Sequence, residues 1–321
     1  MSPEFQPLAL EIPQELAGVR LDAALARLLP NHSRSRIRAW IDQGYVRVAG
    51  RPCRPRDRVL GGERIALEVP RSAPAVEVPA QALELKVIYE DESILVLDKP
   101  VGLVVHPGAG NPDHTLQNAL LAHDPKLGEL PRAGIVHRLD KDTSGLLVVA
   151  REPTAHTSLV RQLAARSVRR EYQAVCVGVL TAGGSIQAPI ARHRFDRTRM
   201  TVRSGGREAV THYRVIERFR GHTLLRVMLE TGRTHQIRVH LAHLKHPIVG
   251  DPVYGGRLRL PRGATPELIA ALRGFKRQAL HAERLELEHP VTGERMHWTA
   301  PLPDDLRALI DALRADVVSG T

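Results

Sequence analysis

A charged turn between two apolar runs, at residues 134–150 (GIVHRLDKDTSGLLVVA), most constrains the fold of this chain. The second run, residues 146–150, has the length and β-branching of a buried strand, and the shorter run 135–136 predicts another. Residues 137–145 between them are charged and turn-forming. A packed strand that carries charged side chains at its end is a common way to build an active site.

Asp140 is the candidate reactive group of this turn because it lies between Arg138 and Lys141. Neighbouring positive charges favour the ionised form of a carboxyl group, so Asp140 should be available as a base or a nucleophile at neutral pH. The alternative is a solvated turn whose charges pair at the surface. Composition alone favours that alternative, because charged turns are far more common than catalytic ones.

The composition indicates a globular protein with a polyanionic partner. The chain has 321 residues, of which 43% are hydrophobic, and this length suits two domains or one large domain with an appendage. A net charge of +11 and a pI of about 10.3 favour nucleic acid over a membrane as the partner. No apolar run approaches the roughly 18 residues of a membrane-spanning helix, and no signal-peptide pattern is present. We therefore expect a cytoplasmic location and no membrane partner.

The N-terminal part of the chain predicts a small basic unit. Apolar residues in 21–29 recur with helical spacing, a second helix follows Ser33 or Ser35, and residues 45–48 alternate as a strand. Eight arginines and only two acids lie between residues 34 and 58. Because guanidinium groups bind phosphate in a bidentate manner, we expect an RNA-binding face, with a solvated basic surface as the alternative. The candidate contacts are Arg34, Arg36, Arg38, Arg47, Arg51 and Arg54.

The whole chain is predicted to be an α+β protein with two domains. Residues 1–19 suggest a loosely ordered lead-in, residues 20–70 the small α/β RNA-binding domain, and residues 71–84 a proline-rich linker. Residues 85–321 would form the catalytic domain. Its many short strands, few long helices and hairpin turns predict a mixed, mainly antiparallel β-sheet.

Nothing in the sequence indicates a cofactor or a metal. Gly108 and Gly110 lack the third glycine of a dinucleotide-binding loop, and no P-loop occurs. Cys53 and Cys176 are far apart and form no CxxC pair, which argues against a disulfide framework or a thiolate site. The histidines of residues 235–246 stand without an H-E-x-x-H motif or interleaved acidic ligands, so RNA contact or internal hydrogen bonding is the favoured interpretation.

Several motifs in order give the chain a family resemblance. His137-Arg138-Leu139-Asp140, followed by Lys-Asp-Thr-Ser-Gly, resembles the catalytic-aspartate motif of the RluA family of pseudouridine synthases. Lys99-Pro100, the tyrosine of Arg169–Tyr172, the segment Glu230–Leu241 and the segment 280–290 are similar to further motifs of that family. Lys99-Pro100 should pack beside the catalytic loop. The resemblance extends from about Arg20 to about Leu313, and residues 20–70 resemble the S4 RNA-binding domain.

The resemblance implies a reaction and a role for each of four residues. The reaction is the isomerisation of uridine to pseudouridine in RNA, on a base that has left its stack, without a cofactor. Asp140 would attack C1′ or act in a path that eliminates the base, and the sequence leaves both routes open. Arg233 would pair with Asp140, and Tyr172 would face the uracil and help to remove the C5 proton. Arg138 would fill the gap left by the flipped base.

The resemblance also implies a substrate, 23S ribosomal RNA, at uridines of its helix 69 stem-loop. We expect a monomer, and free RNA, a large-subunit precursor and the assembled subunit stay open as the form of the substrate. Three alternatives remain: a binding module without catalysis, a glycosidase using Asp140 with Asp142, and a synthase acting on tRNA. Two carboxylates two residues apart on one loop would not readily straddle a sugar, which counts against the glycosidase.

Overall fold

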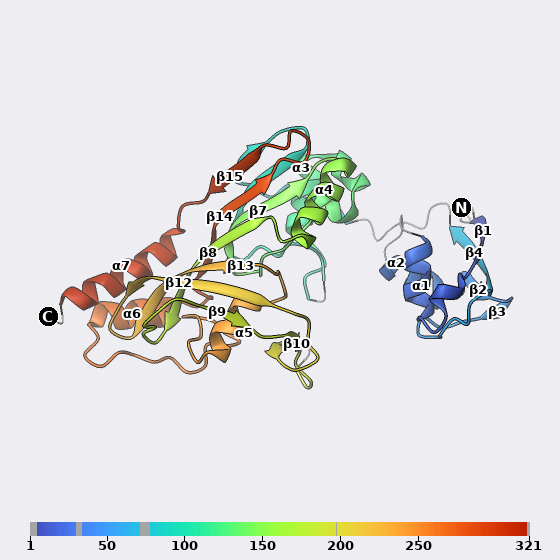
Figure 1. Ribbon diagram of the computed structural model, residues 1–321. Coiled ribbons are helices and arrows are strands. Elements are labelled where there is room, and N and C mark those ends of the chain that lie inside the picture. The colour runs from blue at the N-terminus through green and yellow to red at the C-terminus, as the bar shows by residue number, and fades with distance from the viewer. Residues whose placement is uncertain (1–4, 30–33, 71–77, 109, 197, 320–321) are drawn as a thin grey trace. The chain divides into compact units, whose positions relative to one another are not determined.

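The chain forms two compact units, one up to Val78 and one from Pro79 onward, in a computed structural model (Figure 1). The structure describes residues 5–29, 34–70, 78–108, 110–196 and 198–319. Each unit has its own hydrophobic core.

A four-stranded antiparallel sheet and two helices make up the N-terminal unit. The sheet order is β1 (Phe5–Glu11), β4 (Arg64–Pro70), β2 (Val46–Val48) and β3 (Arg51–Pro52). Helices α1 (Leu21–Leu28) and α2 (Arg34–Asp42) pack against it, with the short 3₁₀ helix η1 (Gln14–Leu16) before them. The apolar residues predicted on one face of residues 21–29, together with Ile37, Trp40 and Ile41 of α2, form the core of this unit. The two predicted helices are therefore confirmed.

The prediction of a loosely ordered lead-in at residues 1–19 is wrong for the part that the structure describes. Strand β1 pairs with β4 along its whole length, with Leu8 opposite Leu67, and Ile12 after it is only 1% exposed. Paired backbone groups and buried aliphatic side chains hold this segment in the unit. Of the predicted linker, residues 71–77 lie outside the described residues. The carbonyl of Pro79 accepts a hydrogen bond from the side-chain Nδ2 of Asn118, and the backbone N–H of Gln81 donates to the carbonyl of Asn118, so both residues belong to the second unit.

The second unit is built on a nine-stranded sheet (Figure 1). Its order is β5 (Val87–Glu90), β6 (Ile94–Lys99), β7 (Ser144–Ala150), β14 (Leu280–Glu288), β8 (Arg169–Val177), β13 (His222–Leu229), β12 (Val210–Arg218) and β9 (Gly184–Gln187), and β15 (Arg295–Thr299) also pairs with β14. Only β7 and β14 run parallel; the other neighbours are antiparallel, so the predicted mixed, mainly antiparallel sheet is confirmed. A separate hairpin joins β10 (Ile190–Arg192) to β11 (Met200–Val202).

Helices cover both faces of this sheet. One face packs against α3 (Leu116–His123), α5 (Gln236–His243), α6 (Pro266–Gly274), α7 (Asp304–Val318) and the 3₁₀ helices η2 (Pro125–Glu129) and η3 (Pro131–Gly134). The other face packs against α4 (Pro153–Ala164). Along β6 the side chains alternate, Leu95 and Leu97 to the first core and Ile94 and Val96 to the second, as a strand buried on both faces requires.

The charged turn of residues 137–143 leads directly into β7, whose seven residues are all buried. The predicted strand at Ile135-Val136 is wrong: Ile135 makes one isolated bridge, to Val149. Glycine is required at Gly145, which has a φ of +109° and where a Cβ would overlap the carbonyl oxygen of Ala282 on β14. This close approach matters for the site, because Ala282 pairs with Gly145 on one side and with Tyr172 of β8 on the other.

Candidate active site

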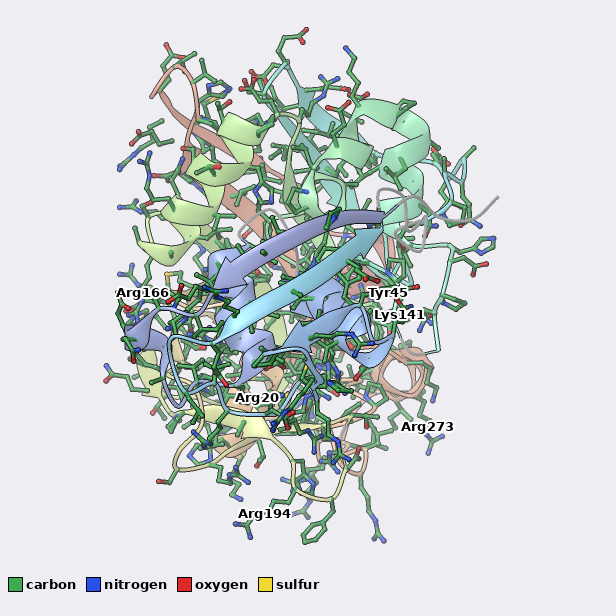
Figure 2. The ribbon with its side chains drawn as sticks, turned by 90° about the vertical axis from the view of Figure 1, so that its right-hand side faces the viewer. Arg20, Tyr45, Lys141, Arg166, Arg194 and Arg273 are labelled. Carbon is green, nitrogen blue, oxygen red and sulfur yellow. The ribbon has the colours of Figure 1, made fainter. Side chains whose placement is uncertain are left out.

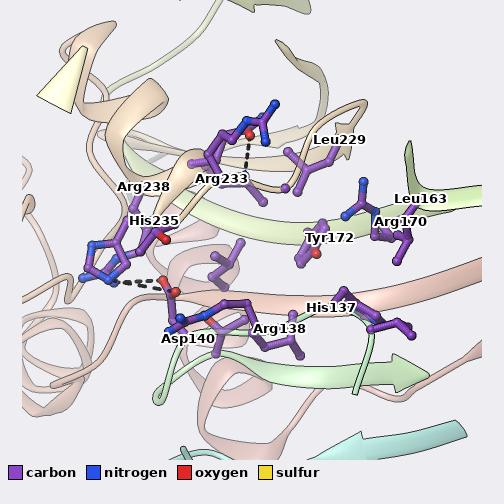
Figure 3. Close-up of a pocket in the computed structure, with 18 of the residues that line it drawn as sticks. His137, Arg138, Asp140, Leu163, Arg170, Tyr172, Leu229, Arg233, His235 and Arg238 are labelled. Carbon is purple, nitrogen blue, oxygen red and sulfur yellow. Dashed lines mark hydrogen bonds and ion pairs between the residues drawn. The ribbon is translucent and has the colours of Figure 1, made fainter. Parts of the chain in front are cut away.

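A pocket of about 300 Å³ lies where the charged turn, β8 and the segment before α5 meet. Asp140, Tyr172, Arg233 and Arg138 all line it, so the structure brings the four catalytic candidates into one pocket (Figure 3). Three separate stretches of the sequence supply them. Strand β14 pairs with β7 in parallel on one side and with β8 in antiparallel on the other. Only β14 therefore separates the strand that follows the Asp140 turn from the strand that carries Tyr172.

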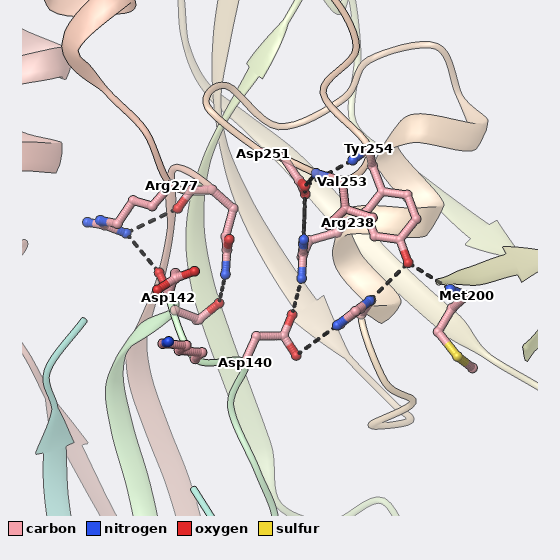
Figure 4. A network of polar contacts seen from close by, with 12 residues as sticks. Asp140, Asp142, Met200, Arg238, Asp251, Val253, Tyr254 and Arg277 are labelled. Carbon is pink, nitrogen blue, oxygen red and sulfur yellow. Dashed lines mark hydrogen bonds and ion pairs between the residues drawn. The ribbon is translucent and has the colours of Figure 1, made fainter. Parts of the chain in front are cut away.

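Asp140 is held by an ion pair with Arg238. The distance between Asp140 Oδ2 and Arg238 Nη1 is 2.9 Å. The guanidinium also donates from Nε and Nη2 to the two carboxylate oxygens of Asp251, at 2.7 and 2.9 Å. Asp251 in turn accepts hydrogen bonds from the backbone N–H groups of Val253 and Tyr254 (Figure 4). Arg238 is therefore fixed from behind and directs one donor at Asp140.

Burial and charge both act on this network. Burial opposes the charge on Arg238, but its hydrogen bonds to Asp251 and the charges of Asp140 and Asp251 outweigh burial and raise the pKa of Arg238. Burial likewise opposes the charge on Asp251, and the hydrogen bonds of Arg238 lower its pKa below the usual range. The Arg238–Asp251 pair therefore stays ionised over the neutral pH range.

The arginine that pairs with Asp140 is Arg238, and the predicted pairing with Arg233 is wrong. Arg233 lies in the turn before α5, and its Nε donates to the backbone carbonyl of Glu208 at 3.0 Å. Arg238 lies in the first turn of α5 and is buried between neighbouring apolar residues. The sequence held a signal for it, because an arginine flanked by Ile237 and Val239 in a buried helix needs a carboxylate partner.

His235 and Tyr254 extend the network on the other side of Asp140. His235 Nε2 lies 4.0 Å from Asp140 Oδ1, and its Nδ1 lies 2.9 Å from the Tyr254 hydroxyl oxygen. That hydroxyl accepts a hydrogen bond from the backbone N–H of Met200 at the start of β11 (Figure 4). Burial lowers the pKa of His235, so the imidazole is neutral at neutral pH. The sequence predicted RNA contact or internal hydrogen bonding for His235 without placing it beside Asp140, and sequence reasoning missed Tyr254.

Tyr172 forms the middle of the pocket and is 5% exposed. Burial raises its pKa, with the charge of Arg170 acting in the opposite direction and that of Asp140 in the same one. The phenol is therefore protonated at neutral pH. Figure 3 shows Tyr172 between the Asp140–Arg238 pair on one side and Arg170 with His137 on the other.

Arg138 lines the pocket but is exposed to solvent, unlike the buried Arg238. It belongs to the same turn as Asp140. The neighbouring His137 faces inward and accepts a hydrogen bond from the backbone N–H of Val148. Burial, and then the charge of Arg170, lower the pKa of His137 to about 3.

Lys99 ties the end of β6 to the catalytic turn, which confirms the expected packing of the Lys99-Pro100 motif. Its side chain is 1% exposed, and Nζ donates to the carbonyl oxygens of Pro100, Leu103 and Lys141 at 2.7, 2.9 and 3.0 Å. Because Lys141 follows Asp140, this contact positions the backbone of the turn. Burial lowers the pKa of Lys99 to about 7, against the charges of Asp142 and Asp140.

In the N-terminal unit the predicted RNA contacts that the structure describes are all at the surface. Arg38, Arg47, Arg51 and Arg54 are exposed, whereas the side chains of Arg34 and Arg36 lie outside the described residues. Arg38 forms an ion pair with Asp42 at 3.5 Å, with both side chains more than half exposed. Basic side chains also project from the second unit, among them Arg166, Arg194 and Arg273 (Figure 2).

Comparison with known proteins identifies the family. The RNA pseudouridylate synthase domain matches residues 93–243, and the S4 domain matches residues 19–65. A ribosomal large subunit pseudouridine synthase D from Xanthomonas campestris is 60% identical over 305 residues, covering 95% of this chain and 92% of that protein. The chain belongs to the RluA family of pseudouridine synthases. It is therefore an isomerase that forms pseudouridine in RNA.

Other relatives agree with this family membership. The synthase D proteins of Pseudomonas aeruginosa and Salmonella typhimurium are 58% and 55% identical, each over 96% of this chain and over 96% and 95% of their own lengths. Among solved structures, human RNA pseudouridylate synthase domain containing 4 is similar with a TM-score of 0.57 and 26% identity, over 71% of this chain and 93% of that one. Human RNA pseudouridylate synthase domain containing 1 is similar with a TM-score of 0.52 and 27% identity, over 74% of this chain and 97% of that one.

The described residues form neither a membrane span nor a metal cluster. They contain no helix long and apolar enough to cross a membrane. They also contain no group of three or more histidine, cysteine, aspartate or glutamate side chains that could hold a metal ion. The histidines at 235 and 240 instead contact the Tyr254 hydroxyl, the Thr211 hydroxyl and the carbonyl of Ala188.

Proposed function

We propose that this protein converts uridines of 23S ribosomal RNA to pseudouridine, at the helix 69 stem-loop of the large subunit. The observation that carries the proposal is the Asp140 carboxylate, held by Arg238 in a pocket beside Tyr172. The relatives named as ribosomal large subunit pseudouridine synthase D support the choice of RNA, because they match nearly the whole chain, including the S4 domain.

Asp140 acts at the sugar of the flipped uridine in this proposal. The N1–C1′ bond breaks, the uracil turns, and a C5–C1′ bond forms; C5 then loses its proton and N1 gains one, so that the product is an isomer of the substrate. Either direct attack of the carboxylate on C1′ or elimination of the base satisfies this balance. Arg238 orients the carboxylate for both, because Asp251 and the backbone amides behind it prevent the guanidinium from turning away.

Tyr172 and Arg138 handle the base in this scheme. The ring of Tyr172 faces the uracil, and its hydroxyl takes part in moving the C5 proton. Because burial raises the pKa of Tyr172, its oxygen is protonated at rest, and a proton received from C5 must be matched by one passed on to solvent or to Asp140. Arg138, which is exposed at the pocket, fills the space that the flipped base leaves in the RNA stack.

The N-terminal unit supplies affinity for the same RNA. Arg38, Arg47, Arg51 and Arg54 are exposed and can reach phosphate groups, and contacts to phosphate fix position without reading sequence. The deciding experiment maps pseudouridines in ribosomal RNA from cells with and without this protein, and restores them with the purified protein on the RNA that lacks them. Loss of helix 69 pseudouridines alone supports the proposal, and loss only in tRNA would contradict it.

A further inference from the structure

Arg170 is a buried cation without a counter-charge among the residues that the structure describes. It precedes Tyr172 by two residues on β8, so both side chains lie on the same face of the strand and line the pocket. Its side chain is 8% exposed, and its Nε is buried without any hydrogen-bond partner among the described residues. No described carboxylate forms an ion pair with it.

The other two buried arginines of the described chain show what Arg170 lacks. Arg238 donates from Nε and Nη2 to Asp251 and from Nη1 to Asp140. Arg277 donates from Nε and Nη2 to Asp305 at 2.6 and 2.8 Å. A guanidinium keeps its proton in proteins, so burial without an anion costs free energy that folding of the free protein does not recover. Such a group is explained if an anion reaches it only when the substrate binds.

The surroundings of Arg170 leave its guanidinium open to the pocket. Gly232 lies against it, and a side chain there would place a Cβ 2.8 Å from Arg170 Nη1. Leu163 and Leu229 lie nearby and carry no charge, and His137 is neutral because its pKa is about 3 (Figure 3). Asp140 is the only acid among the lining residues, and Arg238 already pairs with it.

We infer that Arg170 binds a phosphodiester group of the RNA next to the flipped uridine. The inference rests on the proposed RNA substrate and adds a binding site to it. Side chains two residues apart on a strand are separated by about 6.6 Å, so Arg170 reaches a group beside the one that Tyr172 contacts. The planar fork of the guanidinium fits a phosphate with two parallel hydrogen bonds, and the phosphate supplies the missing negative charge.

The first test removes the charge and measures the free protein. Arg170→Gln should leave the melting temperature of the RNA-free protein unchanged or raise it, because an unpaired buried charge is removed. Its affinity for a helix 69 stem-loop should fall roughly tenfold or more, and Arg170→Lys should restore part of that affinity. A fall in melting temperature would instead assign Arg170 a structural role and overturn the inference.

The second test locates the phosphate. A series of stem-loops carries one neutral methylphosphonate linkage each, around the target uridine, and binding is measured in the Asp140→Asn background so that no turnover occurs. At one position the neutral linkage should weaken RNA binding by the protein that retains Arg170. The same neutral linkage should have little further effect on binding by the protein that also carries Arg170→Gln. The control Arg273→Gln removes an exposed arginine of α6. The fold-change in affinity that it causes should multiply with the fold-change caused by the neutral linkage, at every position of that linkage.

The outcomes separate the two proposals. If the effects of Arg170→Gln and of the neutral linkage multiply at every position, Arg170 contacts no phosphate and the inference fails. A substrate uracil without its O4 oxygen then tests contact with the base. If the parent protein forms no pseudouridine in the unmodified stem-loop or in large-subunit RNA, the proposed function itself fails, whatever Arg170 binds.

Discussion

Arginines in the pocket and arginines on the N-terminal unit have the same chemistry but opposite environments. Arg238 is 4% exposed and holds two carboxylates at 2.7 to 2.9 Å, whereas Arg38 is largely exposed and meets Asp42 at 3.5 Å. A buried, hydrogen-bonded pair fixes geometry and is costly to break; an exposed pair is screened and contributes little. We therefore expect changes in the pocket to act on turnover, and changes on the N-terminal unit to act on affinity that depends on salt.

The largest effect should come from Asp140→Asn. The substitution keeps the size of the side chain and removes its charge, so turnover should fall roughly a thousandfold or more while RNA binding stays within a few-fold of the parent. Single-turnover formation of pseudouridine, alongside a filter-binding assay, measures both. Asp142→Asn, two residues further along the same turn and outside the pocket lining, is the matched control and should have a far smaller effect. Near-normal turnover by the Asp140 variant would remove it from the mechanism.

Replacing Arg238 or Arg233 by lysine, one at a time, tests which of the two arginines supports Asp140. Arg238→Lys cannot hold Asp140 and Asp251 together, so turnover should fall roughly a hundredfold and the free energy of unfolding by about 3 kcal/mol. Arg233→Lys removes one hydrogen bond to a carbonyl and should cost less than about 1 kcal/mol. Denaturant unfolding and turnover are measured for both, and an equal effect in the two variants would contradict the assignment.

Lys99 gives a prediction for the dependence of stability on pH. The pKa of Lys99 is about 7 in the folded state and about 10.5 when unfolded. Between these values the unfolded state binds more protons, so the contribution of Lys99 to the free energy of unfolding rises with pH. From pH 7 to 9 the parent should gain roughly 2 kcal/mol relative to Lys99→Met. Unfolding of both proteins at several pH values measures this, and a difference that does not change with pH would contradict it.

The smallest effect should come from the surface arginines. The triple change of Arg47, Arg51 and Arg54 to Gln should lower affinity for ribosomal RNA and reduce the slope of log affinity against log salt by up to about 3, one for each phosphate that these side chains neutralise in the parent. The corresponding change to Lys keeps the charges and should keep most of the slope. Turnover at saturating RNA should stay close to that of the parent. A slope that is unchanged in the Gln variant would show that these residues are a solvated surface.

The sequence was sufficient where local pattern controls structure. The helices at 21–28 and 34–42 follow from periodicity, and the strand at 144–150 from the apolar run of residues 146–150, because burial of one face or both leaves a direct trace in residue order. The mainly antiparallel sheet follows from the many short strands and hairpin turns. It failed for β1, whose partner β4 lies more than fifty residues away, and at Ile135, where two apolar residues are too short to show whether a strand forms.

Sequence by itself determined which residue types stand near Asp140 and that a basic chain of this length carries the ordered motifs of one enzyme family. Tertiary structure alone decided that Arg238, and not Arg233, reaches the carboxylate and that Asp251 fixes the guanidinium of Arg238 from behind. It also decided that the Nε of Arg170 is buried without a hydrogen-bond partner in the described part of the chain. The physical reason is that an ion pair depends on distance and burial. Those are set by the close packing of β7, β14, β8 and α5, which stand in different parts of the sequence.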